Sequence, residues 1–371
     1  MSKNYDIAII GGGNAGLSLA KSLAQSDIAR KIILIEPIPA IAKQANWCSW
    51  HDDESLKKNS NSIKGVWDTW NIIDQDNVIE HRSHNYKYAC IDAAKYLGEL
   101  ENCIIDQNVE VLRENTQSIS IKNNKKVIIC ESRTIIATHV YDSRPPEIKE
   151  NSLKQHFYGI EIELKPGVKN HETVTLMDFR VDQKSGLHFI YALPFDESRI
   201  FVESTVISEN LNQKSWYKGM ILKWLENQNL TCKTIISEES GVISQALQDN
   251  HHTGIHQIGS NGGATRLSSG YAFHNISKQI KLLSENIKAN NYNVPDVMSN
   301  YLINMDLIFN RVLINNPSLS VDLFIKMAKS LSGEQFSEFM LNKANFNIWC
   351  KVIMRMPKTP FLKESIKIFL D

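Results

Sequence analysis

The sequence has no excess of charge of either sign, because lysine plus arginine and aspartate plus glutamate each number 41 among its 371 residues. A neutral chain has no overall field that would attract nucleic acid, so we expect no nucleic-acid partner and only local charge-driven contacts. The sequence also lacks any stretch near the ~18 to 20 consecutive apolar residues that a membrane-spanning helix needs. We therefore expect a protein that can contact a bilayer without crossing it.

The six cysteines form no CxxC pair, and none has a histidine at metal-ligand spacing. We therefore predict reduced, mostly buried thiols and no metal site. Residues 1–4 lead directly into an apolar strand without the features of a signal peptide, so we expect a cytoplasmic protein. No internal repeat is present, and the chain is longer than one hydrophobic core usually serves. Two closely packed domains are the expected result.

A strand, a glycine-rich turn and a helix are predicted in succession at the N-terminus. Residues 6–10 form a short apolar strand, and the turn that follows has the spacing GxGxxG before a helix with apolar periodicity. These glycines allow a tight turn, close approach of the backbone to a pyrophosphate, and close packing of helix on strand. The residues that we expect to bind a dinucleotide here are Gly11, Gly13, Asn14, Ala15 and Gly16.

Two further features describe that dinucleotide, and the second of them favours FAD over NAD. A second strand over residues 31–35 ends at Glu36, whose carboxylate can accept both ribose hydroxyls of an adenosine and would repel a 2′-phosphate. Much later, a strand over 256–259 leads into a second glycine-rich turn before a helix, with Gly262, Gly263, Gly270 and Tyr271 as expected cofactor contacts. Two such turns, far apart in sequence, suit one long cofactor, although an ordinary flexible loop is the alternative for the second.

The remaining pattern predicts an α/β fold with an interleaved second sheet. Residues 118–121 and 127–130, joined across Asn123 and Asn124, predict a hairpin, and 134–141 a strand returning to the first sheet. Alternating apolar residues predict antiparallel strands over 158–164, 174–177, 188–193 and 200–202, a helix follows over 216–225, and helices dominate from 276. We assign 1–150 and 235–290 to a Rossmann-type FAD-binding domain, 151–234 to an antiparallel-sheet substrate domain, and 291–371 to a helical region that completes the substrate cavity or docks on a membrane.

One acidic residue stands out in the predicted substrate domain. An apolar segment, a turn over 196–198 and a second apolar segment place Glu203 at the end of a predicted hairpin. A desolvated carboxyl of this kind keeps its proton to higher pH and is a candidate general acid. The alternative is a salt-bridged or solvent-facing glutamate at the end of a strand.

This hairpin resembles the FxYxLPF…VE(E/D)T signature of the lycopene cyclase family, the flavoprotein carotenoid cyclases of bacteria and plants. Ser204 stands where the family usually has a second acid. The resemblance extends over nearly the whole chain in the family's order, through the segments Trp47–His51, Gly262–Phe273, Met305–Phe309 and Met356–Leu362.

The resemblance implies a lycopene β-cyclase, in which each linear end of lycopene or a related linear carotene is protonated and closed to a β-ring, giving γ-carotene and β-carotene. It implies Glu203 as the catalytic acid and FAD as a cofactor that must be reduced, with NADPH or NADH supplying the electrons. Ser204 puts a carboxylate pair in doubt. A redox flavoenzyme, such as a hydroxylase or isoprenoid reductase, and an inactive carotenoid-binding protein remain alternatives.

The C-terminal segment over 321–370 interleaves large apolar residues with lysine and arginine. Because carotenes reside in membranes, an amphipathic surface with basic flanks would let the substrate enter without crossing water. We therefore expect a peripheral protein on the cytoplasmic face of the membrane. The alternative is that these helices pack their apolar faces onto the protein itself.

Overall fold

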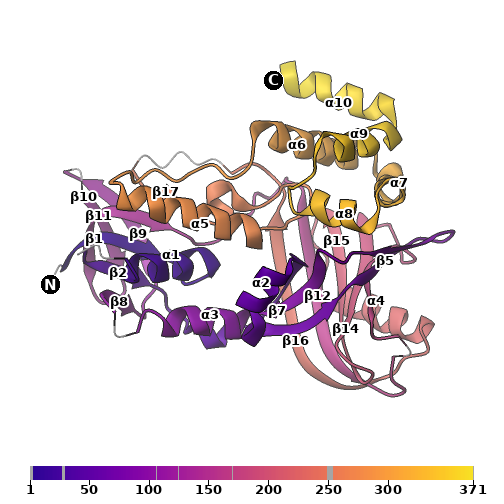
Figure 1. The fold of residues 1–371 in the computed structure, drawn as a ribbon, viewed down its shortest axis with the longest axis horizontal. Coiled ribbons are helices and arrows are strands. Elements are labelled where there is room, and N and C mark those ends of the chain that lie inside the picture. Colours follow the sequence, from indigo (N-terminus) through magenta and orange to yellow (C-terminus); the bar gives the residue numbers. More distant parts are fainter. Residues whose placement is uncertain are drawn as a thin grey trace.

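Two large β-sheets and a helical C-terminal region form the main architecture of the protein, seen here in a computed structural model (Figure 1). The structure describes residues 3–26, 30–105, 107–123, 125–168, 170–248 and 254–370. Within these ranges each large sheet has seven strands, and a smaller sheet has three.

The first sheet contains the N-terminal strand and has the order β8-β2-β1-β11-β10-β9, with β17 paired to β11. Its strands at the centre are parallel and buried on both faces, which explains their continuous apolar runs. Three helices cover one face through a shared apolar core. The bounds are β1 (Lys3–Ile10), β2 (Ile32–Ile35), β8 (Val109–Leu112), β9 (Thr116–Lys122), β10 (Lys125–Cys130), β11 (Thr134–Asp142), β17 (His256–Gln257), α1 (Asn14–Ala24), α3 (Ala93–Asn102) and α5 (Phe273–Lys288).

The strands expected in this sheet from the sequence are confirmed. β11 runs parallel to β1, as the return of the chain to the first sheet requires. β9 and β10 form the expected hairpin, where Asn123 has a φ of 49° in the left-handed region that asparagine tolerates in tight turns. Asn124 lies outside the described residues.

The second sheet has the order β16-β12-β15-β14-β13-β5-β6. All pairs are antiparallel except β13 with β5. A helix, α4, packs on one face, and the opposite face contributes to a large aromatic core. The bounds are β5 (Thr69–Ile73), β6 (Val78–Arg82), β12 (Lys154–Leu164), β13 (Thr173–Asp178), β14 (Leu187–Pro194), β15 (Arg199–Ser208), β16 (Cys232–Ser244) and α4 (Lys214–Asn227).

The expected strands of this sheet are all present, but β12 and β15 are several residues longer than expected. β15 continues to Ser208 because Thr205, Val206 and Ile207 are β-branched, buried and paired with both neighbouring strands. Glu203 therefore lies in the middle of a strand and not at the end of a hairpin.

The sheets also divide the chain differently from the ranges proposed for the domains. β5 and β6 fall within 1–150, and much of β16 falls within 235–290, yet all three belong to the antiparallel sheet. β5 pairs with a strand about a hundred residues away, a long-range contact that local periodicity does not contain. The domain division itself stays a prediction.

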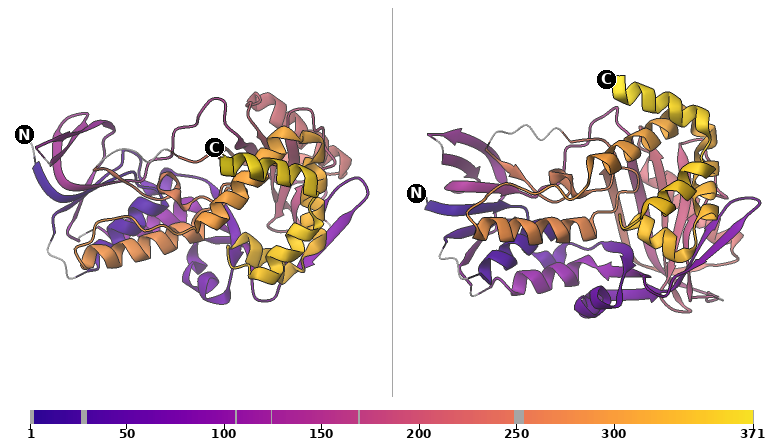
Figure 2. Two further views of the ribbon diagram at one scale, coloured as in Figure 1. Left: turned by 90° about the horizontal axis from the view of Figure 1, so that it is seen from above. Right: turned by 45° about the horizontal axis from the view of Figure 1, so that its top comes forward.

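Helices dominate the C-terminal region, as expected, and lie across one end of the antiparallel sheet (Figure 2). The three-stranded sheet has the order β3-β7-β4. The bounds are β3 (Asn46–His51), β4 (Ile63–Trp67), β7 (Lys87–Asp92), α2 (Asp53–Lys58), α6 (Asn300–Asn315), α7 (Ser320–Ser330), α8 (Gly333–Met340), α9 (Phe346–Arg355) and α10 (Lys358–Leu370). Among the described helices, none is long and apolar enough to cross a membrane.

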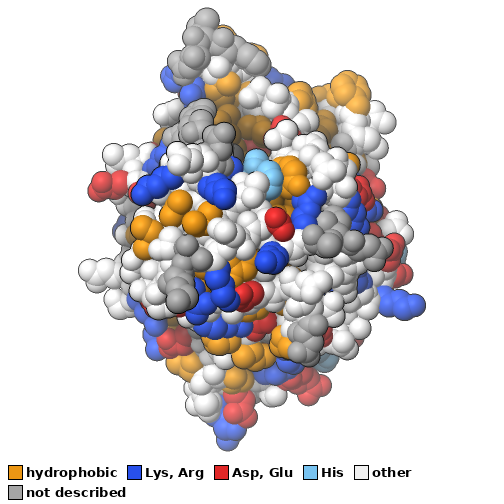
Figure 3. All heavy atoms as spheres, turned by 90° about the vertical axis from the view of Figure 1, so that its left-hand side faces the viewer, with side chains coloured by type: hydrophobic (Ala, Val, Ile, Leu, Met, Phe, Trp, Pro, Cys, Tyr) orange, Lys and Arg blue, Asp and Glu red, His pale blue; other side chains and the backbone are white. Residues whose placement is uncertain are grey.

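Basic and acidic side chains are interspersed on the face shown in Figure 3, as the charge balance of the sequence predicts. The expectation of a cytoplasmic protein used residues 1–4, and of these Met1 and Ser2 lie outside the described residues. The six cysteines are free thiols, but the expectation that most are buried is wrong: only Cys90 and Cys130 are buried, and the other four are partly exposed.

Candidate active site

A cavity of about 1240 Å³ lies where the two large sheets, the three-stranded sheet and the C-terminal helices meet. It exceeds the roughly 300 to 1,000 Å³ of ordinary ligand pockets. Of the residues singled out from the sequence, the structure brings Gly13, Asn14, Ala15, Glu203, Gly262, Gly263, Gly270 and Tyr271 together in its lining.

The first glycine-rich turn joins β1 to α1 and presents backbone to this cavity. Gly11 has a φ of +93°, which favours glycine, and a Cβ at Gly16 would lie 1.9 Å from the carbonyl oxygen of Gly11. Helix and strand therefore approach more closely than any side chain would permit. A Cβ at Gly13 would meet nothing within 4 Å, and no side chain caps the helix there. The positive end of α1 thus faces open space.

Glu36, at the end of β2, lies outside the cavity lining and is engaged by its own neighbours. Its Oε2 accepts a hydrogen bond from the Gly12 N–H at 2.5 Å and pairs with Lys43 at 2.7 Å, and its Oε1 accepts from the Ile38 N–H. Burial alone would raise the pKa of this carboxyl, but Lys43 and the two N–H groups outweigh it and hold the pKa below its usual value. Glu36 is therefore a carboxylate at neutral pH, although a ribose would have to compete with Lys43 for it.

The second glycine-rich turn, a π-type turn over Ser260–Ala264, lies against the first. A Cβ at Gly259 would lie 2.7 Å from the Cβ of Ala15, so the two turns touch. The buried side chain of Gln279 on α5 holds the turn, because it accepts from the Gly259 N–H and donates to the Gly262 carbonyl, each at 2.8 Å. A Cβ at Gly263 would meet nothing within 4 Å.

These features fit a dinucleotide. Two turns with exposed backbone meet at the start of α1, and the open space at Gly13 and Gly263 lies where a phosphate would reach N–H groups without side-chain obstruction. Gly11 and Gly16 do not line the cavity. They allow the tight turn and the close packing of α1 on β1 that position the lining residues.

Glu203 projects into the cavity from the middle of β15 and is 9% exposed. Its Oε1 accepts a hydrogen bond from the Thr205 hydroxyl at 2.5 Å. Within the described part of the chain, no lysine or arginine forms an ion pair with it. Burial, followed by the negative charge of Glu239, raises the pKa of Glu203 to about 8, although the Thr205 hydroxyl opposes this rise. The carboxyl is therefore largely protonated at neutral pH.

Ser204 points to the opposite face of the sheet. Its Oγ is fully buried and hydrogen-bonds Nε2 of His188 at 2.9 Å. Successive side chains on a strand alternate between faces, so an acid at position 204 would point away from Glu203 and out of the cavity. The serine therefore does not remove a carboxylate from the cavity.

Three tyrosines surround the acid. Tyr191 pairs in register with Glu203, so both point to the same face of the sheet. The Tyr88 hydroxyl lies 2.9 Å from that of Tyr191 and 3.3 Å from that of Tyr271, and all three residues line the cavity. The three hydroxyls are close enough to hydrogen-bond one another. The aromatic rings therefore form the wall of the cavity around a protonated carboxyl.

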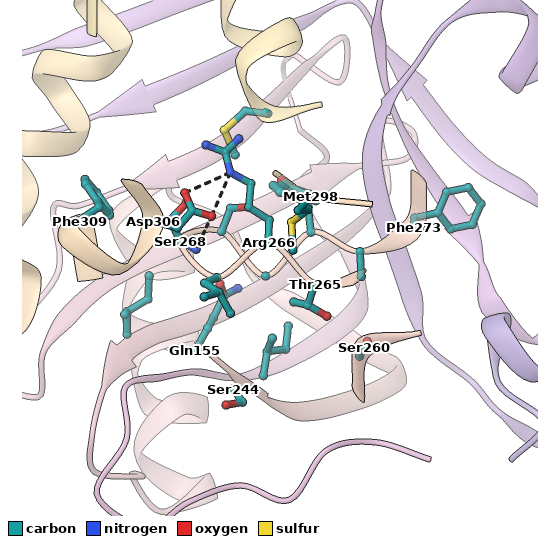
Figure 4. Close-up of a pocket in the computed structure, with 18 of the residues that line it drawn as sticks. Gln155, Ser244, Ser260, Thr265, Arg266, Ser268, Phe273, Met298, Asp306 and Phe309 are labelled. Carbon is teal, nitrogen blue, oxygen red and sulfur yellow. Dashed lines mark hydrogen bonds and ion pairs between the residues drawn. The ribbon is translucent and has the colours of Figure 1, made fainter. Parts of the chain in front are cut away.

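A buried ion pair fixes the loop between the second glycine-rich turn and Tyr271 (Figure 4). Arg266 is 2% exposed, and its Nε lies 3.4 Å from both carboxylate oxygens of Asp306 on α6. Its Nη1 donates to the Phe339 carbonyl on α8, and Asp306 also accepts from the Ser268 hydroxyl at 2.7 Å. The cofactor side of the cavity is thereby joined to the C-terminal helices.

Sequence reasoning missed Glu239, Gln279 and the pair of Arg266 with Asp306. Gln279 and Asp306 are polar residues on helix faces that are otherwise mostly apolar, and a polar residue at such a position was the signal that the sequence offered. Nothing in the local sequence distinguishes Glu239 from the acidic residue that precedes it.

Solved structures share this architecture. A geranylgeranyl bacteriochlorophyll reductase-like protein from Thermoplasma acidophilum is 14% identical and superposes with a TM-score of 0.65 over 98% of this chain and 96% of its own. A halogenase PltM mutant in complex with FAD is 10% identical, with a TM-score of 0.53 over 91% of this chain and 78% of its own. The chain thus has the α/β fold of FAD-dependent flavoproteins, with a Rossmann-type nucleotide-binding domain, as expected from its sequence.

Within that class, the family model described as "Lycopene cyclase protein" matches residues 6–307, and the chain belongs to this family. A lycopene beta-cyclase of Pantoea ananas is 23% identical over 257 residues, which cover 67% of this chain and 65% of that protein. A chloroplastic lycopene beta cyclase of an Oncidium hybrid cultivar is 25% identical over 55% of this chain and 47% of its own length. The chain thus spans about half to just under two thirds of these relatives.

Replacement of Glu203 by glutamine should change how stability depends on pH. The wild-type carboxyl loses its proton near the ordinary value of 4.5 when unfolded and near 8 when folded. The folded state therefore holds the extra proton between these values, and wild-type stability falls as pH rises through this window. We expect Glu203→Gln to gain stability relative to wild type by a few kcal/mol, as an order of magnitude, between about pH 5 and about pH 9.

Urea unfolding at both pH values measures this difference. Glu163→Gln is the matched control, because Glu163 is half-exposed on the adjacent strand β12 and forms a surface ion pair with Lys233. A difference between Glu203→Gln and wild type that does not vary with pH would show that Glu203 titrates as an ordinary glutamate.

Proposed function

We propose that this protein is a lycopene β-cyclase, which converts the linear ends of lycopene or a related linear carotene to β-rings by acid catalysis with FAD bound. The observation that carries the proposal is the buried carboxyl of Glu203, whose pKa burial raises, in a cavity that aromatic side chains and two glycine-rich turns suited to a dinucleotide also line. Family membership and the names of the relatives in Pantoea and Oncidium support the same activity.

The residues of the chain have defined tasks in this reaction. Glu203 holds a proton that it can give to the terminal double bond of the polyene, because burial keeps its carboxyl neutral at physiological pH. The rings of Tyr88, Tyr191 and Tyr271 line the cavity and exclude water from the carbocation that follows, and their π electrons would attract its charge. Ring closure and loss of a proton then give the β-ring, with no net redox change.

FAD is the cofactor that the site fits. The turns at Gly11–Gly16 and Gly262–Gly263 would hold its pyrophosphate, Glu36 its ribose, and Gly270 and Tyr271 would lie toward its flavin. When bound in its reduced form, FAD would supply negative charge near the cavity that stabilises a developing cation. NADPH or NADH would keep it reduced.

A membrane-facing surface would deliver the substrate. On α9 and α10, Phe346, Met354, Leu362 and Ile366 are exposed large apolar residues, beside exposed basic residues at positions 351, 355, 358, 363 and 367. Leu362 also lines the cavity, so the exposed surface and the cavity are continuous. Apolar side chains with basic flanks suit the interface of an anionic bilayer, and we propose that the protein binds there peripherally, on the cytoplasmic side.

Cyclisation should depend on the Glu203 carboxyl. In a bacterial host that accumulates lycopene, we expect the wild-type chain to yield pigments of unchanged mass with one or two β-rings. Glu203→Gln should reduce their formation by roughly 10²-fold or more, the usual contribution of a general acid. Chromatography of the extracted pigments measures the yield, and Glu163→Gln should behave as wild type. Unaltered lycopene beside flavin-loaded wild-type protein, or stoichiometric oxidation of NAD(P)H with product, would rule out the cyclase.

A side chain at Gly13 should displace the cofactor without unfolding the protein. The Cβ of Gly13→Val would enter space free of protein atoms, where the pyrophosphate would lie. We expect FAD binding to weaken by at least roughly tenfold, since steric overlap typically costs about 1 to 3 kcal/mol. The ratio of flavin to protein absorbance after purification measures this loss. Gly98→Ala on α3, where a Cβ would meet only Ile41 at 3.8 Å, is the control. Wild-type flavin content in Gly13→Val would place the pyrophosphate elsewhere.

Acidic residues on the exposed apolar surface should weaken membrane binding. Met354 and Ile366 are 68% and 60% exposed, and we expect the double variant Met354→Glu, Ile366→Glu to bind anionic vesicles at least about tenfold more weakly, because two apolar contacts are lost and like charge is added. Co-sedimentation with vesicles measures binding. Val78→Glu, at a residue 66% exposed on β6, is the matched control. Equal binding by the double variant and wild type would exclude this surface.

A further inference from the structure

Three adjacent strands bring a second carboxyl into line with Glu203. Glu203 on β15 pairs in register with Gly159 on β12, and Gly159 pairs in register with Glu239 on β16. Residues directly opposite one another in a sheet point to the same face. Both carboxyl side chains therefore project from the cavity face of the sheet, and both line the cavity.

Gly159, the residue between them on β12, has no side chain, and the ring of Phe201 occupies the space above it. A Cβ at Gly159 would lie 2.3 Å from Cζ of Phe201 and 3.3 Å from the Cβ of Glu203. The two carboxyl groups, on strands roughly 10 Å apart in their backbones, are thus separated by an apolar floor and not by a polar group. Charges interact more strongly across such a medium than across water.

The contacts of the two carboxyl groups differ in a way that determines which one is ionised. Glu239 accepts hydrogen bonds from both the backbone N–H and the side-chain amide of Asn46, at 2.9 and 3.0 Å. The Asn46 oxygen in turn accepts from Lys64 at 2.8 Å. Glu203 receives its hydrogen bond from the neutral hydroxyl of Thr205. Burial raises the pKa of Glu239 to about 7, although the Asn46 donors and Lys64 oppose this rise. The pKa of Glu203 is raised further, to about 8, so Glu239 ionises first and the last proton stays with Glu203.

We propose that Glu239 is the second carboxyl of the acid site, and that Glu203 and Glu239 together hold one proton, which resides on Glu203. This proposal rests on the proposed role of Glu203 as the acid. Glu239 is a positioning residue, because its negative charge opposes the ionisation of Glu203 until substrate arrives. The proton given to the polyene is balanced by the proton that the closed ring releases, so the pair returns to one proton without any redox partner.

Other groups that face the pair do not replace this coupling. Burial raises the pKa values of Tyr88, Tyr191 and Tyr271 above their usual range, and that of Cys90 likewise, so these groups are neutral where the pair titrates. Lys64 is paired with Glu161 at 2.6 Å as well as bound to Asn46. The negative charge of Glu161 raises the pKa of Glu239 further, and Cys48 on β3 also lines the cavity.

Infrared spectroscopy of the purified, flavin-loaded protein tests the proposal independently of cyclisation. The C=O band of a protonated carboxyl that disappears in Glu203→Gln identifies Glu203, and its intensity is followed against pH. In Glu239→Gln, we expect the midpoint of this band to move down by about one pH unit, so that roughly tenfold less Glu203 is protonated above the midpoint. Glu239→Asp keeps the charge and should stay near the wild-type midpoint, and Glu163→Gln should leave it unchanged.

The pH profile of cyclisation gives the second readout. The alkaline limb should move to lower pH in Glu239→Gln by the same interval, with little loss of rate well below the midpoint. Glu239→Ala repeats both measurements if the glutamine variant does not fold. An infrared midpoint that is unchanged in Glu239→Gln and Glu239→Ala would overturn the proposal. A shifted midpoint in a protein that cyclises nothing would support the carboxyl pair while refuting the proposed cyclase function.

Discussion

Exclusion of water from the carboxyl of Glu203 is the constraint on which the arrangement of the whole protein depends. A glutamate that is 9% exposed keeps its proton only where no cation pairs with it and where apolar groups surround it. Here the surroundings come from parts of the chain that are distant in sequence: β7 with Tyr88, β14 with Tyr191, and the loop with Tyr271. The C-terminal helices complete the enclosure with residues such as Phe339 and Met340.

The same requirement explains the buried polar contacts around the cavity. Arg266 and Asp306 neutralise one another inside the protein. Arg266 also donates a hydrogen bond to the carbonyl of Phe339, and Asp306 accepts one from the hydroxyl of Ser268. This cluster fixes the loop that carries Tyr271 against α6 and α8, so the wall beside the acid cannot shift independently of the helices. Gln279 has the corresponding role for the second glycine-rich turn. The two glycine-rich turns and the wall around Glu203 are thus joined through buried polar contacts.

Much of the nucleotide-binding half could be predicted from sequence, because its signals are local. Gly11 at a φ of +93° and the close packing at Gly16 are consequences of a turn a few residues long. Glu203 was singled out partly from local sequence, since it follows an apolar segment of a predicted hairpin, and partly because that hairpin resembles the lycopene cyclase signature. Its position in mid-strand was not predicted, because the length of β15 depends on pairing with both β12 and β14. The placement of β5, β6 and β16 in the second sheet likewise depends on distant partners.

The sequence by itself determined the order of strands and glycine turns, the apolar hairpin with its glutamate, and the family to which the chain belongs. Only the tertiary structure decided which carboxyl stands beside Glu203. Ser204 is its neighbour in sequence but points to the other face, toward His188, because side chains alternate along a strand. Glu239 is 36 positions away yet shares its register row through Gly159, because hydrogen bonding between strands, not chain distance, sets which side chains share a face.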